Sequence, residues 1–449
     1  MGAVDSIFKI PELTKRLWFT FWMLVIYRMG IFVPTPGIDA ERFRRIFEGQ
    51  SAAAGNLYGL VNMFTGGALE NFSIFALGIM PYISVSIIMQ LLTTVWKPLE
   101  ELQKEGAEGR RIITRYTRIG TVALSLFQGY MIAVGLQAQG VVATPGFRFC
   151  IITALTLCAG TMFIMWLGEQ ITERGIGNGI SIIIFAGIVA RMPATLLITF
   201  DLAATTGEPS PLGILAILAI ALATIAFIVF VERCQRRIPI QYPRRAVGRH
   251  MTQASTQHLP LKVNMSGVIA AVFASTLIGF PVMVAQMAKL DWLNEYLVYI
   301  TPPHVLYEVL FAALIMFFCF FYTAIVFDPN KVSEDLKKAG GFIPTVRPGR
   351  DTADFLNTIL SRLTLWGGIY VCIICIFPTI IYRELGASAF AAFFGGTAVL
   401  IVVGVMMDTV AQIQSHILAR NYEGFMAKGP GKVRGASSGI NIRGQLIKR

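Results

Sequence analysis

Long apolar runs alternate with polar connections along the chain, and ten of them are candidate membrane spans. A bilayer core takes about 20 apolar residues per helical crossing. The fifth run reaches that length only if it continues through Met192–Phe200, beyond the charge at Arg191. Because the runs are continuously apolar and do not alternate as barrel strands do, they predict an all-α polytopic membrane protein. The runs are Leu17–Val33, Ser73–Trp96, Ile119–Leu136, Phe149–Gly168, Gly177–Ala190, Pro211–Val231, Val263–Ala288, Val309–Phe327, Leu363–Tyr382 and Gly386–Met407.

Charge is scarce and lies mainly on one side of these spans. Only 14% of the 449 residues are charged, against about 25% in an ordinary soluble domain. Of the 38 Lys and Arg residues, 30 lie in the N-terminal tail and every second connection, and seven lie in the other connections. Since basic residues gather on the cytoplasmic side, both termini are predicted to be cytoplasmic. Arg28 lies inside the first run, where we favour a side chain that extends to the outer interface over a functional charge.

Catalytic and metal-binding motifs are not recognisable in the sequence. Cys372 and Cys375 have C-x-x-C spacing but lie inside the ninth run without a nearby His, which favours packing over a metal or redox site. Nine of the ten runs contain no Asp, Glu, Lys or Arg, and membrane enzymes and ion-coupled transporters usually need ionisable groups there. We therefore predict no enzymatic activity, no cofactor and no metal.

Two features of the second run and its surroundings are left open by the residues alone. Ile79, Ile83, Ser86 and Gln90 recur on one helical face, which fits ordinary helix packing better than a pore lining. The segment 56–72 is too broken by Gly66 and polar residues to span. It fits a re-entrant segment surrounded by protein and a surface amphipathic helix equally well.

Several longer motifs follow one another in order along the chain. They are Gly78–Ser84 running on to Gln90–Leu92, Trp166–Arg174 leading into the turn Gly175–Gly179, Leu259–Asn264, Arg347–Gly349 and Gly395–Thr397. Through these motifs the sequence closely resembles the SecY family of bacterial protein-conducting channels. The resemblance extends over roughly residues 5 to 430.

The resemblance implies ten transmembrane helices in two pseudo-symmetric five-helix halves around a central pore. On this chain the N-terminal half would be residues 1–190 and the C-terminal half residues 211–412. A hinge connection at 191–210 would join them, and 413–449 would be a cytoplasmic tail. The basic cytoplasmic loops would be 232–262 and 328–362.

Site residues also follow from the resemblance, motif by motif. It implies a re-entrant plug helix at about residues 60–72, with Leu60, Phe64, Gly66, Gly67 and Phe72. The pore ring would consist of Ile79, Ile83, Ile184, Ile269, Val272 and Ile401. A lateral gate would use Gln90, Gln128 and Thr276. Ala270 replaces a proline that relatives often have, which makes the facing of Ile269 less certain.

The function implied is a gated channel that translocates unfolded secretory polypeptides and inserts membrane proteins sideways into the bilayer. The expected partners are SecE-like and SecG-like membrane subunits, the SecA motor ATPase, the ribosome, and nascent chains with signal peptides. Ribosome or motor contacts would fall on Arg236, Arg237, Arg244, Arg245, Arg347 and Arg350. The location implied is the cytoplasmic membrane of a bacterium. The alternative is a polytopic transporter for a small solute.

Overall fold

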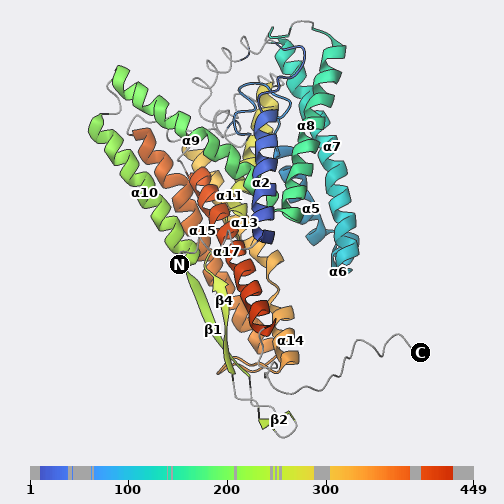
Figure 1. Ribbon diagram of the computed structural model, residues 1–449, viewed down its shortest axis with the longest axis vertical. Helices are drawn as coiled ribbons and strands as arrows, with labels where there is room; N and C mark the ends of the chain where they lie inside the picture. Colours follow the sequence, from blue (N-terminus) through green and yellow to red (C-terminus); the bar gives the residue numbers. More distant parts are fainter. Residues whose placement is uncertain are drawn as a thin grey trace, which may run out of the picture.

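The structure, a computed structural model, describes most of the chain. Figure 1 shows a bundle of long helices, with a β-hairpin and a short helix at its lower end. The described residues are 11–38, 43, 62, 65–138, 140–142, 145–206, 210–242, 246–247, 250–251, 255–287, 304–384 and 396–427. Of the expected site residues, Leu60, Phe64, Arg244 and Arg245 lie outside these ranges.

Each of the ten apolar runs overlaps a helix. Seven of the described helices are long and apolar enough to cross a membrane, and two shorter ones, Met80–Val95 and Ile269–Gly279, are also apolar. The prediction of a helical, multi-span fold is confirmed. The helices that match the runs are α2 (Pro11–Gly30), α5 (Met80–Val95), α7 (Ala107–Ala138), α8 (Phe147–Arg174), α9 (Gly179–Thr206), α10 (Pro211–Arg233), α11 (Ile269–Met287), α13 (Val305–Val326), α15 (Arg350–Glu384) and α17 (Gly396–Ala427).

The second run is helical only from Met80 onward, although its apolar pattern begins at Ser73. Residues 74–79 form turns instead. Gly78 has a φ of 55°, a left-handed conformation that interrupts a helix. Pro81 lies in the first turn of α5, where its missing N–H removes no helical hydrogen bond. Backbone chemistry at these two residues therefore sets the start of the helix.

The fifth run is a single long helix, α9, with Pro193 inside it. The residues expected as a hinge connection, 191–210, are therefore helical as far as Thr206. Apolar residues continue on both sides of the proline, so the helix persists through a position that usually favours a break. The division of the chain into two halves at this point stays a prediction.

A β-hairpin occupies the loop 232–262, which the sequence predicted only as a basic loop. Strand β1 (Gln235–Tyr242) pairs antiparallel with β4 (Ser255–Lys262) in the register Ile238 to Leu259. A second small pair joins β2 (Ala246–Val247) to β3 (His250–Met251). Ile238 and Ile240 are buried while their neighbours are exposed, which is the alternation of a strand with one covered face.

Helices from distant parts of the chain share one apolar core. Helix α11 packs against α5, α7 and α13, and α17 packs against α9, α10 and α15. A single cluster of buried residues includes members of α5, α9, α11, α13, α15 and α17. Both expected halves therefore contribute to the same core.

Candidate functional site

The six expected ring positions come together in that shared core. Ile79, Ile83, Ile184 and Ile401 are buried members of the cluster, and Ile269 and Val272 pack against it. Ile269 begins α11, and Ala270 is fully buried in the first turn of that helix. The structure thus gives regular helical geometry at the position where the missing proline made the facing of Ile269 uncertain.

The three expected gate positions lie on α5, α7 and α11, and α11 contacts both other helices. Gln128 and Thr276 are buried, whereas Gln90 is half-buried. The hydroxyl of Thr276 donates to the carbonyl of Val272 in its own helix at 2.8 Å. The Oε1 atom of Gln128 is buried without a hydrogen-bond partner among the described residues. The helices of the expected gate are therefore in contact. The hydrogen bond of Thr276 stays within α11 and does not join it to α5 or α7.

The described part of the expected plug, residues 65–72 and hereafter the plug segment, is inserted among several helices. Leu69 and Phe72 pack in a cluster with Leu136 of α7 and Leu157 of α8. Ala68 belongs to the same core as four of the ring positions. The segment is a series of turns and not the helix that was expected. The sequence left open a re-entrant segment surrounded by protein and a surface amphipathic helix. The burial of residues 65–72 agrees with the first of these.

Two glycines shape the plug segment. Gly66 and Gly67 have φ values of 67° and 93°, which L side chains rarely adopt. A Cβ atom on Gly66 would lie 2.9 Å from the Cα of Gly187 in α9, closer than real side chains approach. The backbone of the plug segment therefore reaches the backbone of α9 directly.

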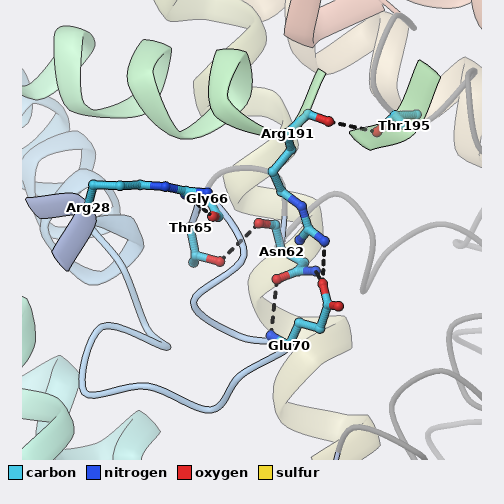
Figure 2. A network of polar contacts seen from close by, with 7 residues as sticks. All are labelled: Arg28, Asn62, Thr65, Gly66, Glu70, Arg191 and Thr195. Atoms are coloured by element: carbon cyan, nitrogen blue, oxygen red, sulfur yellow. Dashed lines mark hydrogen bonds and ion pairs between the residues drawn. The ribbon is translucent and has the colours of Figure 1, made fainter. Parts of the chain in front are cut away.

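Charged and polar groups surround the same segment, as Figure 2 shows. Arg28 of α2 donates from Nη1 to the carbonyl of Gly66 at 2.9 Å. Arg191 of α9 forms an ion pair with Glu70 through Nη2 and Oε2. The side chain of Asn62 donates to Glu70 Oε2 at 3.2 Å and accepts from the Glu70 backbone N–H at 3.1 Å. Arg28 thus contacts the plug segment, and its extension to the outer interface stays a prediction.

Sequence reasoning did not select Glu70 or Arg191 as site residues. A signal was present, because Arg191 interrupts an otherwise apolar run and an ionisable group in a span usually has a function and a partner. The partner was not predictable, because Glu70 lies 121 positions away along the chain. Only the fold brings the two charges together.

The two basic loops form one unit at the lower end of Figure 1. The backbones of Gln241 and Phe342 exchange hydrogen bonds of 2.9 and 3.0 Å, which joins β1 to the segment after α14 (Pro329–Ala339). Ile238, Leu261, Ile343, Leu356 and Leu360 pack in one cluster beneath them. Four exposed arginines lie on this unit, and together we name them the basic face: Arg236, Arg237, Arg347 and Arg350.

The turn that carries Arg347 is fixed by hydrogen bonds. Ser333 of α14 donates to the carbonyl of Gly349 at 2.5 Å, and Thr352 donates to the carbonyl of Arg347 at 2.8 Å. Gly349 has a φ of 115°. The Arg-Pro-Gly motif is therefore a rigid turn that displays its arginine to solvent.

Comparison with known proteins agrees with this arrangement. A model of the SecY family matches residues 73–410. The protein translocase subunit SecY of Pseudomonas aeruginosa is 47% identical over 446 residues, covering 98% of this chain and 99% of the relative. The corresponding subunit of Escherichia coli is 48% identical over 427 residues, covering 93% and 95%. A solved protein-conducting channel has a TM-score of 0.65 at 16% identity, covering 95% and 99%. Sec61 from a canine ribosome–channel complex has a TM-score of 0.62 at 16% identity, covering 95% and 99%. By sequence and by fold, the chain belongs to the SecY family.

Proposed function

We propose that this chain forms the gated path by which unfolded polypeptides cross a membrane or enter it sideways. The observation that supports it is the shared core, which contains Ala68 of the plug segment and four ring positions and against which the other two ring positions pack. A constriction of branched apolar side chains blocks ions by dewetting yet deforms around a polypeptide of any sequence. A small-solute transporter would instead need ordered polar groups near the midplane. The ring side chains offer none.

We assign the remaining roles on the same basis. The ring would close the pore around the plug, and the contacts of α11 with α5 and α7 would separate to admit a signal peptide. Interhelical polar bonds in membranes are worth only about 0.6–2 kcal/mol, so polar contacts between these helices would not keep them from separating. A signal peptide brings its own apolar stretch of about 7–15 residues, which would replace those contacts.

The partners we propose act from outside this chain. The basic face would bind the ribosome, whose phosphates attract arginine, and the SecA motor, with Arg347 as its central contact. A SecE-like subunit and a SecG-like subunit would accompany the chain in the bilayer. The location would be the inner membrane of a bacterium, with both termini in the cytoplasm.

Photocrosslinking to a stalled secretory chain tests the path directly. A photoreactive side chain placed at Ile83 or Ile401 should crosslink to the translocating polypeptide, because both positions belong to the ring. Phe230 of α10 is a matched apolar control, since it is 67% exposed on the surface of the bundle. It should give no crosslink to a chain in the pore. Failure at both ring positions, or equal yield at Phe230, would overturn the proposed path.

A further inference from the structure

An ion pair joins the plug segment to α9. The guanidinium of Arg191 contacts the carboxylate of Glu70, and both side chains are only about one-fifth exposed, at 21% and 20%. Asn62, itself buried, holds Glu70 at both its carboxylate and its backbone N–H. These two hydrogen bonds help to hold the carboxylate of Glu70 beside Arg191 of α9.

We propose that Glu70 and Arg191 form a charged latch, which keeps the plug segment against α9 and must break before a polypeptide enters the pore. The latch rests on the proposed function, because it names the residues that hold the closed position of the same channel. Glu70 and Arg191 are positioning residues, and Asn62 supports them by orienting the carboxylate.

The burial of the two side chains makes the pair suitable for this role. Fully exposed ion pairs contribute little because water and salt screen them. Fully buried pairs are difficult to separate, because each ion would then lack both its partner and water. With one-fifth of each side chain exposed, the charges attract each other strongly and still have water available when they part. Such a contact can hold the segment and also release it.

Two other polar contacts on the plug segment use its backbone. Arg28 and the hydroxyl of Tyr27, both on α2, donate to the backbone carbonyls of Gly66 and Thr65 at 2.9 and 3.2 Å. The guanidinium of Arg191 also lies over Gly67, where its Nη1 would be 3.3 Å from a Cβ atom. The ion pair is different, because both of its partners are side chains. Exchanging the two charges therefore tests this contact without removing the backbone hydrogen bonds.

The test uses the full chain with its partner subunits in proteoliposomes and in cells. The measurements are the idle ion conductance and the export of a reporter with a defective signal peptide. The variants are Glu70→Gln, Arg191→Gln and the reversed pair Glu70→Arg with Arg191→Glu. Glu169→Gln is the matched control, because it removes an ion pair between α8 and Arg118 of α7 that does not involve the plug segment. Protein amount and thermal stability are measured in parallel.

Each single variant should raise idle conductance by about three- to tenfold, as expected for the loss of a partly buried ion pair. The reversed pair should bring the conductance back toward the wild-type level, and Glu169→Gln should leave it unchanged. Merely structural residues would show reduced protein amounts without recovery in the reversed pair.

Single variants with wild-type conductance would overturn the latch, as would a reversed pair that conducts as much as they do. If the single variants fail to accumulate, the reversed pair is compared with the wild type alone. Conductance near the wild-type level supports the latch, and raised conductance overturns it. Failure of the proposed function is distinguishable, because the wild-type chain would then export no normal secretory protein. An intact export activity with unchanged conductance in the variants would remove the latch alone.

Discussion

At Gly66 the plug segment comes so close to α9 that no side chain fits between them. Its Cβ atom would meet the Cα of Gly187 at 2.9 Å, and its own φ of 67° disfavours any L side chain. Gly187 has the reciprocal geometry, since a Cβ there would lie 3.2 Å from the Cα of Gly66. Glycine at Gly66 is therefore a condition for this close approach, and a side chain at Gly187 would make a tight contact.

Replacing Gly66 by alanine should loosen the plug segment. The substitution adds a backbone clash to a strained φ, and strain of this kind costs about 1–3 kcal/mol. We expect increased idle conductance and export of substrates with defective signal peptides. Gly106→Ala is the matched control, because Gly106 has a φ of 83° but no atom within 4 Å of its Cβ position. If both variants raise conductance equally, the close approach is not what holds the segment.

Single residues also show how far the sequence could be interpreted. The branched apolar side chains at the ring positions were identified from motifs, and the structure places four of them in the shared core and two against it, as their hydrophobicity leads one to expect. The partner of Arg28 was not predicted, because it is a backbone carbonyl, that of Gly66. Because every residue has a backbone carbonyl, the amino-acid sequence does not show which one accepts the hydrogen bond. The role of an isolated charge therefore depended on the fold.

At the scale of elements, α11 packs against α13, α5 and α7. The buried Gln128 of α7 places an amide oxygen in this region without a hydrogen-bond partner among the described residues. A buried acceptor without a partner costs about 1–3 kcal/mol. An apolar side chain of similar size at position 128 would therefore make the packing around α7 more stable.

Gln128→Leu should consequently stabilise the closed arrangement of these helices. Leucine keeps most of the volume and removes the unsatisfied oxygen. We expect a higher melting temperature of the purified complex and weaker export of substrates with marginal signal peptides. Thr224→Val serves as the control, because it loses only a hydrogen bond within α10, which is not a gate helix, and should change both quantities little. A lower melting temperature for Gln128→Leu would contradict this account and indicate that the amide is satisfied by water or a partner.

Apolar length predicted the existence of the helices better than their ends. The second run looked helical from Ser73, but Gly78 and Pro81 move the start of α5 to Met80. The hairpin of β1 and β4 was missed because residues 232–262 were interpreted only as a basic loop. Its alternating Ile238 and Ile240 were the available signal for a strand. Long-range contacts with α15 cover that face, and short runs do not reveal them.

At the scale of the whole molecule, the net charge of +12 is unevenly distributed. The basic face projects from the end of the bundle where β1, β4 and α14 lie, whereas the connection between α7 and α8 lies at the opposite end (Figure 1). The two basic loops are joined through Gln241 and Phe342, so their charges keep fixed relative positions. A partner rich in phosphate would meet several arginines at once.

Charge reversal at the two ends of the molecule separates a local contact from the effect of net charge. Arg236→Glu should weaken ribosome binding. It should also make the negative slope of log affinity against log salt shallower by about one, as expected for one lost phosphate contact. Arg148→Glu changes the net charge equally, but Arg148 is an exposed residue at the start of α8, at the opposite end of the bundle. It should therefore leave both the affinity and the slope near their wild-type values. Because both variants alter the overall field by the same amount, an equal loss in the two would mean that the ribosome responds to total charge. A loss confined to Arg236→Glu would instead locate the contact on the basic face.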